Sequence, residues 1–316
     1  MILKNKKILV TGGAGFIGSH LVDRLIEEKH QVIVIDNLST GKRENINPKA
    51  KFYKCDIYSC KAAEIIKKEQ PNIIFHLAAQ INLRQSVKDP INDAKTNILG
   101  ALNIISSFIA TNKNRLNQCT CIFSSTGGAI YGDAKIIPTP ETYEPHPLSP
   151  YGITKLSAEN YLYYFYQVFG LKYISLRYAN VYGPRQNPQG EAGVIAIFID
   201  KMLRSEQPFI FGNGKQTRDF VYVKDIVEAN ILAMKSKKIG VYNIGTGKET
   251  DINTLFKCLS KSTKTSFKPR YRPLPLGEQK RSCLDYSRAK QELKWTPKFP
   301  LKLGLRETID WFQTKY

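Results

Sequence analysis

The sequence predicts an α/β fold, in which a doubly wound parallel sheet is joined to a smaller C-terminal α+β lobe. Through residue 180 of the 316-residue chain, short apolar runs alternate with longer segments of helical period. Strands and helices that alternate at this spacing form parallel sheets covered by helices on both faces. From residue 181 onward prolines and turn residues become more frequent, which predicts a less regular second lobe.

The first predicted elements are a strand, a helix and a second strand. The stretch "KILVTGG" (7–13) is an apolar run that ends in glycines, and residues 17–30 have helical period. The stretch "QVIVIDN" (31–37) is another short buried strand. Because only a short apolar run precedes the glycines, the start of the sequence is interpreted as a strand and not as a signal peptide.

The next four elements continue the alternation. The stretches "AAEIIKKEQ" (62–70) and "NILGALNIISSFIAT" (97–111) have helical period. Between them, "NIIFHLAAQ" (72–80) is a strand that leaves into a loop. The stretch "CTCIFSST" (119–126) is a strand whose two cysteines alternate along an apolar run, as on one face.

A helix over 151–169 and a strand over 172–180 complete this region. We expect residues 1–180 to form the first domain, with 220–246 returning to it, and residues 181–316 to form the second lobe.

Composition and charge exclude several classes of protein. Hydrophobic residues make up 42% and charged residues 23%, as in ordinary globular proteins. No segment approaches the ~20 apolar residues that cross a membrane. The six cysteines include no CxxC pair, which favours a reduced, cytoplasmic protein without a structural metal. The lysines behind the net charge of +20 are scattered, which favours a small anionic ligand over nucleic acid.

A glycine motif lies between the first strand and the first helix. In "TGGAGFIG", Gly12, Gly15 and Gly18 are spaced three residues apart. Such glycines allow a tight turn, close approach of a pyrophosphate and close helix packing, and the helix N-terminus attracts phosphate. Asp36 ends the next strand, where a carboxylate binds both ribose hydroxyls of adenosine and repels a 2′-phosphate. The motif predicts a Rossmann-type domain that binds NAD and not NADP.

The stretch "LSPYGITK" places Tyr151 and Lys155 one helical turn apart on the same face. A free phenol has a pKa near ~10, and a nearby cation lowers it. The pair follows a strand ending in Ser124, Ser125 and Thr126, at the sheet edge where ligands of open α/β sheets bind. Tyr151 is therefore a candidate general base whose pKa Lys155 lowers.

These motifs, together with "DNLSTG" (36–41), "CDI" (55–57), "HLAAQ" (76–80), "SSTGGAIYG" (124–132) and "RYANVYGPRQ" (177–186), resemble an extended short-chain dehydrogenase/reductase of the NAD-dependent epimerase/dehydratase family. They occur in order over nearly the whole chain and are most similar to the UDP-glucose 4-epimerase group. Beyond the glycines, Asp36 and Lys155, the resemblance implies NAD contacts from Phe16, Ile17, Asn37, Asp56, Ile57, Leu77, Ala78, Ala79, Gln80, Asn97 and Tyr178.

The resemblance also implies a reaction. Tyr151 removes the proton of the sugar 4′-OH while hydride passes from C4′ to NAD, Lys155 binds the nicotinamide ribose, and Thr126 or Ser125 hydrogen-bonds the reacting hydroxyl. The 4-keto sugar then turns over and takes the hydride back on its other face, so the net reaction is epimerisation. Related dehydratases and decarboxylases need a carboxylate in the loop after Thr126, where this sequence has Gly127.

By the same resemblance, the second lobe holds the UDP-sugar. Asn180 and Arg218 match residues that bind the diphosphate, although Arg218 is also placed to form a surface ion pair with Asp219. Many epimerases carry an arginine just before a late Gly-Glu pair, and none precedes Gly277–Glu278 here. The candidate replacements are Arg270 and Arg272.

Ser282 occupies a position where the family has either a bulky tyrosine or a small residue. A serine leaves room for an N-acetyl group beside the sugar C2, so we expect UDP-GlcNAc and UDP-GalNAc to be substrates besides UDP-glucose and UDP-galactose. Arg84 and Arg185 are further candidates near the sugar. Pairing of Arg185 with a uronate carboxylate is the alternative, and it implies a UDP-glucuronate 4-epimerase.

Three other interpretations differ in class. A basic scaffold that binds nucleic acid or a membrane surface would show steep salt-dependent retention on polyanions and no UDP-sugar binding. An NAD-binding regulator usually lacks the tyrosine or the lysine, and this sequence has both. A net reductase needs an exchangeable and usually phosphorylated cofactor, which Asp36 disfavours. Helices 97–111 and 156–169 carry more apolar and aromatic residues than one buried face needs. Relatives pair these helices across a dimer contact, so we expect a homodimer.

Overall fold

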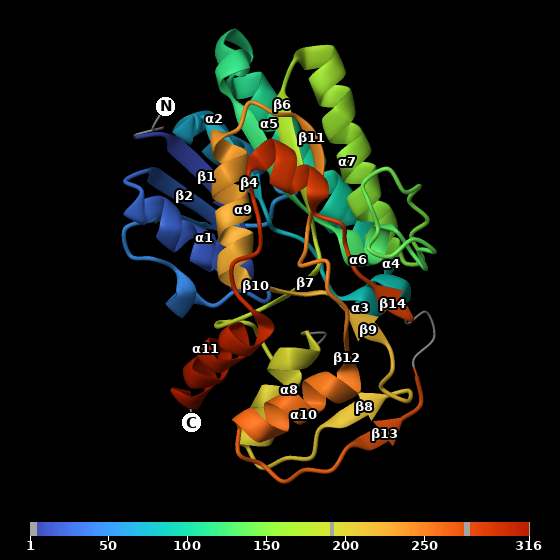
Figure 1. Ribbon diagram of the computed structural model, residues 1–316. Coiled ribbons are helices and arrows are strands. Elements are labelled where there is room, and N and C mark those ends of the chain that lie inside the picture. Colours follow the sequence, from blue (N-terminus) through green and yellow to red (C-terminus); the bar gives the residue numbers. More distant parts are fainter. Residues whose placement is uncertain (1–4, 190–192, 275–278, 316) are drawn as a thin grey trace. The chain divides into compact units, whose positions relative to one another are not determined.

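The computed structural model describes residues 5–189, 193–274 and 279–315 (Figure 1). The chain forms two compact units. The first unit comprises Met1–Thr126, Ser149–Arg177 and Val227–Tyr242, and the second comprises Gly127–Leu148, Tyr178–Ile226 and Asn243–Tyr316.

The division differs in three places from the expected 1–180 and 181–316. The stretch 127–148 groups with the second unit, the returning segment is shorter than 220–246, and residues 178–180 belong to the second unit. Asn243 explains the first difference, because its backbone N–H donates to Glu141 Oε1 at 2.7 Å and its side chain donates to the Thr139 carbonyl at 2.9 Å. These bonds fix the stretch to the polypeptide around residue 243.

A seven-stranded sheet forms the centre of the first unit, in the order β11-β6-β5-β4-β1-β2-β3. Its strands are β1 (Lys7–Thr11), β2 (Gln31–Asp36), β3 (Lys51–Lys54), β4 (Ile73–His76), β5 (Thr120–Thr126), β6 (Lys172–Tyr178) and β11 (Gly240–Ile244). Strand β1 pairs in parallel with both β2 and β4, β2 pairs in parallel with β3, and β4 with β5. The predicted doubly wound α/β fold is confirmed.

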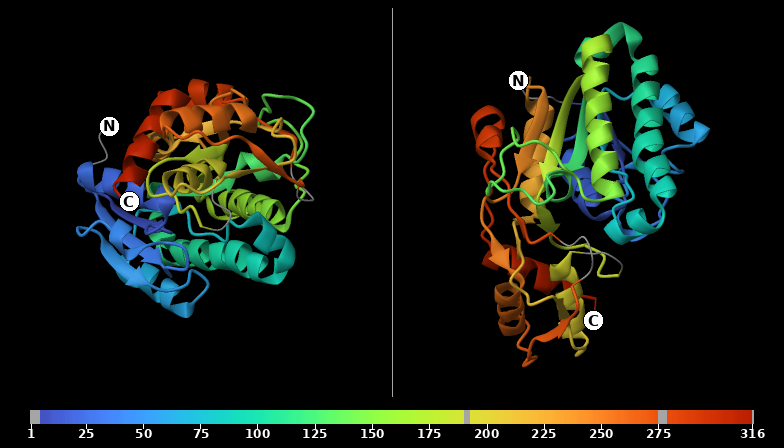
Figure 2. Two further views of the ribbon diagram at one scale, coloured as in Figure 1. Left: turned by 90° about the horizontal axis from the view of Figure 1, so that it is seen from below. Right: turned by 90° about the vertical axis from the view of Figure 1, so that its right-hand side faces the viewer.

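Helices cover both faces of this sheet. The helices are α1 (Phe16–Glu27), α2 (Cys60–Glu69), α3 (Leu83–Lys88), α4 (Pro90–Ala94), α5 (Gly100–Thr111), α7 (Pro150–Phe169) and α9 (Val223–Lys235), with short turns η1 (Arg43–Asn45), η2 (Lys95–Leu99) and η3 (Lys113–Gln118). In all views α5 and α7 run side by side (Figures 1 and 2). Ion pairs of Glu28 with Lys235 at 2.9 Å and of Arg24 with Glu228 at 3.4 Å join α1 to α9.

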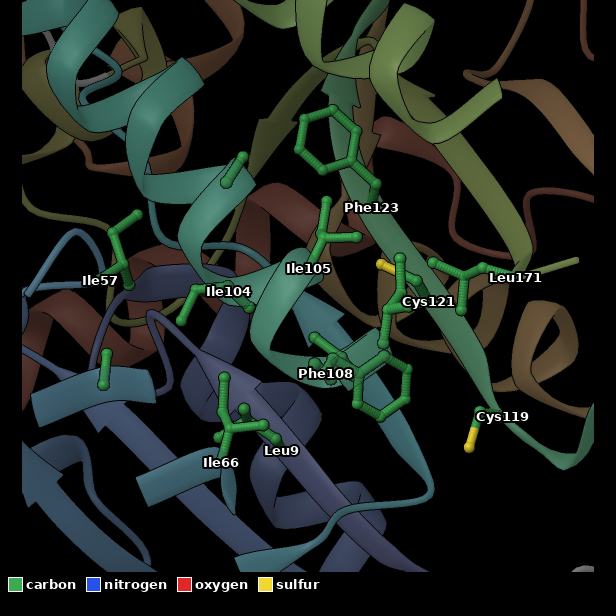
Figure 3. Close-up of a cluster of buried hydrophobic side chains, with 14 of the residues drawn as sticks. Leu9, Ile57, Ile66, Ile104, Ile105, Phe108, Cys119, Cys121, Phe123 and Leu171 are labelled. Atoms are coloured by element: carbon green, nitrogen blue, oxygen red, sulfur yellow. The ribbon is translucent and has the colours of Figure 1, made fainter. Parts of the chain in front are cut away.

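The hydrophobic core lies between the sheet and helices α2, α5 and α7. On α5, Ile104, Ile105 and Phe108 are at most 1% exposed and pack into this cluster (Figure 3). The cysteines at 119 and 121 belong to the same cluster, as the alternating pattern predicts, and all six cysteines are free thiols. This core fixes the ends of the strands at which the candidate site is built.

Strand β3 and the two short helices α3 and α4 were not predicted. Strand β3 is the last strand of the sheet, and none of its four residues is fully buried. Lysines at both of its ends suit an edge strand but interrupt the apolar pattern by which strands are recognised. The predicted helix 97–111 begins as a π-helical turn, η2, before α5 continues it.

The second unit contains three small sheets. Strands β7 (Asn180–Tyr182) and β10 (Phe220–Tyr222) pair in parallel. The other sheets combine β12 (Thr250–Asp251), β9 (Thr217–Arg218) and β14 (Arg281–Ser282), and β13 (Arg270–Arg272) with β8 (Phe209–Phe211). Its helical elements are α6 (Gly127–Ile130), α8 (Val194–Leu203), α10 (Ile252–Ser262), η4 (Ala289–Leu293) and α11 (Leu301–Gln313). Within the described ranges, no helix has both the length and the apolar character that a bilayer crossing requires.

Candidate active site

The glycine loop connects β1 to α1. Gly12 has a φ of +73°, a conformation that side chains disfavour, and a Cβ there would lie 2.7 Å from the Ala78 backbone nitrogen. A Cβ on Gly18 would lie 2.1 Å from the Gly12 carbonyl oxygen, whereas one on Gly15 would meet only that oxygen, at 3.2 Å. Gly12 and Gly18 are therefore required by the protein's own packing, and Gly15 borders open space.

The N-terminus of α1 suits an anion. The N-cap is Gly15, which supplies no side-chain cap, and the first turn contains no acidic residue. Phe16 and Ile17 are the first helical residues and are half-buried. Uncapped backbone N–H groups and the positive end of the helix dipole form the arrangement that binds a diphosphate.

Asp36 lies at the carboxyl end of β2 and is 7% exposed. Its carboxylate accepts hydrogen bonds from the backbone nitrogens of Ala14 at 3.0 Å and Leu38 at 2.8 Å. These bonds fix its orientation, and since an ionised carboxylate accepts about four bonds, ribose hydroxyls have acceptor sites left. Next to it, Asn37 Nδ2 donates to Asp56 Oδ1 at 2.6 Å.

Ile57 is more deeply buried than its expected contact with adenine suggests. It is 5% exposed, and its side chain packs against α5, where a Cβ on Gly100 would lie 2.6 Å from it. Its carbonyl accepts a bond from Asn103 Nδ2 at 2.7 Å. Its contact with adenine stays a prediction.

The loop after β4 is held against β1. The backbone nitrogens of Leu77 and Ala78 donate to the Thr11 carbonyl and hydroxyl, both at 3.2 Å. The half-buried residues Leu77, Ala78, Ala79 and Gln80 therefore lie beside the glycine loop. This places the predicted nucleotide-lining segment at the edge where β1, β2 and β4 end.

His76, which the sequence did not single out, supports this loop from beneath. It is 1% exposed, its Nδ1 lies 2.8 Å from Thr11 Oγ1, and its ring stacks on Phe123. Burial lowers the pKa of His76 to about 3, and the positive charge of Lys155 adds to this, so the ring is neutral at physiological pH.

Helix α7 carries the predicted catalytic pair in its first two turns. Ser149 caps it by accepting a bond from the Gly152 nitrogen at 3.2 Å, and Pro150 occupies the first turn, where no N–H is needed. The backbone nitrogen of Tyr151 donates to Ser86 Oγ at 3.3 Å. The serine and proline of "LSPYGITK" thus fix where the tyrosine stands.

Lys155 is 3% exposed and points toward the end of β5. Its Nζ donates to the Ser124 carbonyl at 2.7 Å and lies 4.6 Å from the centre of the Phe123 ring. Burial lowers the pKa of Lys155 to about 8, and the carboxylates of Glu159 and Asp93 oppose this shift. The ammonium group is therefore still largely protonated at neutral pH.

The Tyr151 phenol differs from expectation in the direction of its pKa shift. Burial raises its pKa and Asp93 raises it further, whereas the side-chain hydrogen bond with Thr126 lowers it. Lys155, which was expected to lower this pKa, donates to the Ser124 carbonyl. Tyr151 is a neutral phenol, hydrogen-bonded to Thr126.

Ser125 is an unsatisfied group at this site. It is 3% exposed, and its buried hydroxyl has no hydrogen-bond partner among the described residues. A buried hydroxyl without a partner is costly, and a ligand bound at the end of β5 can supply one. Together with the uncapped α1 and the free acceptor sites of Asp36, this fits a dinucleotide.

Asn97 and Asp93 form a buried polar cluster beside the pair. Asn97 Oδ1 accepts a hydrogen bond from the Gln80 backbone nitrogen, and its Nδ2 donates one to the Gln80 carbonyl, both at 2.9 Å. The Asn97 side chain therefore binds both backbone groups of Gln80. Asp93 accepts a bond from Thr154 Oγ1 at 2.7 Å. Asp93 was not predicted from the sequence, although its position four residues before Asn97 was a usable signal.

In the second unit, two predicted substrate residues are paired across the adjacent strands β9 and β14, and a third lies on β7. Ser282 pairs with Arg218 in the parallel β14–β9 ladder, and the Asn180 nitrogen donates to the Asp219 carbonyl at 2.9 Å. Because side chains alternate along a strand, Arg218 and Ser282 project from the same face of this sheet. Asn180 is half-buried and Ser282 is 8% exposed.

The proposed surface ion pair between Arg218 and Asp219 is absent. Asp219 is fully buried and accepts bonds from the nitrogens of Thr246, Gly247 and Leu284 at 2.8–3.3 Å. Arg218 Nη1 donates instead to the Thr217 carbonyl at 2.8 Å. Asp219 therefore anchors the strand that carries Arg218.

The remaining predicted residues are spread over both units. Tyr178 is buried at the end of β6, Arg185 is half-buried with a φ of +66°, and Arg84 is exposed on α3. Arg270 and Arg272 are both exposed on β13. The late loop at Gly277–Glu278 lies outside the described residues, so its missing arginine has no structural account.

No group of three or more metal-ligating side chains occurs in the part of the chain that the structure describes. The polar side chains gathered at the end of β5 are a phenol, hydroxyls and an ammonium group.

Comparison with known proteins agrees with this arrangement. Residues 8–245 match the model of the NAD dependent epimerase/dehydratase family. The chain is 45% identical over 306 residues to a putative UDP-glucose 4-epimerase of Methanocaldococcus jannaschii. This alignment covers 97% of this chain and 98% of that protein.

Two solved structures are similar over almost their full length. A UDP-glucose 4-epimerase with UDP-glucose, from Thermotoga maritima, is 52% identical with a TM-score of 0.95, covering 98% of this chain and 99% of that one. A UDP-N-acetylglucosamine 4-epimerase from Methanobrevibacter ruminantium M1, in complex with UDP-N-acetylmuramic acid, is 38% identical with a TM-score of 0.92, covering 99% and 100%. The resemblance drawn from the motifs is confirmed: the chain belongs to the NAD dependent epimerase/dehydratase family, and NAD is its cofactor.

Proposed function

We propose that the chain is an NAD-dependent 4-epimerase of UDP-sugars, an isomerase that interconverts UDP-glucose and UDP-galactose through a transient 4-keto sugar. The observation that carries this proposal is the cluster of Tyr151, Thr126 and Lys155 at the end of β5, in the same unit as the glycine loop. The 52% identity to a structure with bound UDP-glucose supports the choice of substrate.

The dinucleotide site is assigned to the first unit. The uncapped N-terminus of α1 holds the diphosphate, Asp36 accepts bonds from the adenosine ribose, and the loop after β4 lines the path of the cofactor. The adenine lies near Asp56, and Asn97 supports the loop from below by its two bonds to Gln80. Bound NAD supplies the hydride acceptor and donor for the sugar C4.

Residues of the chain accept the proton of the sugar 4-OH and return it. Thr126 hydrogen-bonds the sugar 4-OH and Tyr151 accepts its proton, then returns it when the ketone is reduced. The Tyr151 pKa must fall for this step. Lys155 would bind the nicotinamide ribose, and its positive charge one helical turn from Tyr151 would favour the phenolate. Ser125, whose hydroxyl has no partner in the described chain, gains one from the ligand.

The substrate site is assigned to the second unit. Arg218 and Asn180 bind the diphosphate, since a guanidinium group suits phosphate oxygens. Arg84 and Arg185 are further candidates near the sugar. Ser282 leaves space beside the sugar C2, and the similarity to a UDP-N-acetylglucosamine 4-epimerase in complex with UDP-N-acetylmuramic acid supports acceptance of N-acetylated substrates.

The activity test uses purified protein with UDP-galactose or UDP-N-acetylgalactosamine and no added NAD, with both C4 epimers measured by NMR. Interconversion without added cofactor is expected, because NAD remains bound between turnovers. No conversion of either sugar, even after NAD is added, contradicts the proposal. Conversion of UDP-glucuronate alone would favour the uronate 4-epimerase.

Ser282→Tyr is expected to lower kcat/KM for UDP-N-acetylgalactosamine on the order of 10–200-fold and to leave UDP-galactose nearly unchanged. The physical reason is that the tyrosine ring fills the space of the N-acetyl group. Ser282→Ala is the control and retains both activities. An equal loss of both activities in Ser282→Tyr shows that this position does not select the C2 substituent.

A cytoplasmic homodimer is part of the proposal. Six free thiols suit a reducing compartment. Apolar and aromatic side chains are exposed along α7: Tyr161 41%, Tyr163 57%, Tyr164 46%, Val168 58% and Phe169 48%. Such a surface is typical of a protein–protein contact.

The expected mass in solution is about twice the 35.9 kDa of one chain. Val168→Asp is expected to give monomers in analytical ultracentrifugation, because it places a charge in the exposed α7 surface. Ile136→Asp, at a site of equal exposure in the second unit, is the control and leaves the mass unchanged. A monomeric wild-type protein removes the dimer from the proposal.

A further inference from the structure

Asp93 is a buried carboxylate for which the proposed reaction has no role. It lies on α4 and is 0% exposed. Its Oδ2 accepts a bond from Thr154 Oγ1 at 2.7 Å, and its Oδ1 accepts bonds from Gln80 Nε2 at 2.8 Å and Asn97 Nδ2 at 3.1 Å. All three partners are donors, as a carboxylate buried without a counter-ion needs.

The three bonds join α4 to two distant segments of the first unit and to the π-helical turn that directly follows α4. Thr154 is the α7 residue directly before Lys155, Asn97 is in the π-helical turn η2, and Gln80 is in the loop after β4. Gln80 is in turn bound through its backbone to Asn97. Asp93 therefore couples the helix that carries Tyr151 to the loop that lines the proposed cofactor path.

The negative charge of Asp93 also acts on both groups of the catalytic pair. It raises the pKa of Tyr151 and that of Lys155. On α7 the other charge facing Lys155 is Glu159, which forms an ion pair with Arg177 at 2.6 Å.

The other titratable groups around Asp93 are either neutral or exposed to solvent. His76, beneath the loop, is neutral. Arg84 and Lys88 on α3 and Lys95 on η2 are exposed to solvent, which screens their charges. Asp93 is thus the buried charge of α4 that acts on the pair.

We propose that Asp93 is a positioning residue of the epimerase reaction, which holds α7 against the loop after β4 through Thr154, Gln80 and Asn97 and places a buried negative charge beside Tyr151 and Lys155. The proposal rests on the proposed function for the role of the pair. Its geometric basis is the set of three hydrogen bonds to one buried carboxylate.

The first test is Asp93→Asn, which keeps the size of the side chain and removes its charge. Its amide nitrogen then faces other donors, so kcat is expected to fall about 10–100-fold with little change in KM. Removal of the charge makes both groups of the pair more acidic, so the pH profile of kcat moves to lower pH by about half to one unit.

The second test separates position from charge. Thr154→Val removes the hydrogen bond to Asp93 but keeps the carboxylate, so kcat falls while the pH profile stays in place. Thr154→Ser restores the hydroxyl and is expected to recover most of the activity. Since Thr154→Val is close in size to the native residue, it serves as the test even if Asp93→Asn does not fold.

The matched control is Asp225→Asn in the second unit. Asp225 is 2% exposed and accepts bonds from the Lys298 and Phe299 nitrogens at 2.9 and 3.1 Å. Its replacement is expected to lower the melting temperature without moving the pH profile. If Asp93→Asn and Thr154→Val behave in the same way as this control, Asp93 has a structural role only and the proposal is wrong.

A measurement that needs no substrate distinguishes the proposed role of Asp93 from the proposed epimerase activity. Lys155 titrates near pH 8, apart from ordinary lysines near ~10.4, so NMR of [¹³Cε]lysine-labelled protein resolves it, and Lys155→Met assigns the signal. Asp93→Asn is expected to lower this titration by about half to one unit. An unchanged titration contradicts the proposal, whereas a lowered titration in a protein without epimerase activity contradicts only the proposed function.

Discussion

Tyr151→Phe is expected to lower the kcat of UDP-galactose epimerisation by about 10²–10⁴-fold, the range that a positioned general base contributes. The phenylalanine ring keeps the packing of the first turn of α7, and the Tyr151 backbone bond to Ser86 is unaffected. What is lost is the hydroxyl that Thr126 hydrogen-bonds and that accepts the substrate proton. NAD content and melting temperature are expected to remain those of the wild type.

The control for this variant is Tyr164→Phe on the same helix. It removes a hydroxyl from a side chain that is 46% exposed, and it keeps the ring in the exposed surface of α7. The kcat values of the two variants, measured by steady-state kinetics, are expected to differ by the full catalytic contribution of the Tyr151 hydroxyl. If Tyr151→Phe retains kcat within about threefold, the proton is accepted elsewhere and Tyr151 is not the base.

Gly18→Ala is expected to abolish NAD retention and to lower the melting temperature, whereas Gly15→Ala should weaken NAD binding alone. A Cβ on Gly18 would stand 2.1 Å from the Gly12 carbonyl oxygen and 2.9 Å from its carbon, which are backbone atoms that cannot turn aside. A Cβ on Gly15 meets one atom at 3.2 Å and otherwise extends into the space proposed for the diphosphate.

The measurement is the NAD content of the purified variants after denaturation, together with melting temperatures of the NAD-free proteins. Only Gly18→Ala should melt earlier in the NAD-free state, because its clash lies within the protein. Equal melting temperatures and equal NAD content in both variants would contradict the assignment of the loop.

The parts of the site that local pattern determines were predicted from the sequence. Gly12 and Gly18 occupy positions where the backbone leaves no room for a side chain. Glycine is therefore required at both positions, and the spacing of the glycines in the sequence predicts the loop. The helical spacing of Tyr151 and Lys155, and the serine and proline that begin their helix, are equally local. The alternation of apolar strands and helices likewise determines the sheet of the first unit.

What depends on contacts between distant segments was not predicted. The bond from Lys155 to the Ser124 carbonyl and the bonds of Asp93 with Gln80 and Thr154 join residues 13 to 61 positions apart. The rise of the Tyr151 pKa by burial was not predicted for the same reason, because spacing along a helix says nothing about burial or about a second partner for the lysine. Strand β3 was missed because its pairing with β2, and not its own pattern, makes it a strand.

The central claim is that the hydrogen on the sugar C4 leaves and returns within one closed site. The most direct test is conversion of UDP-[4-²H]galactose by the purified protein in ordinary water, with mass spectrometry and NMR of the UDP-glucose formed. The account predicts that deuterium is retained at C4 of the product without added NAD. Loss of the deuterium to solvent would show that C4 is inverted by proton exchange, and would contradict the account.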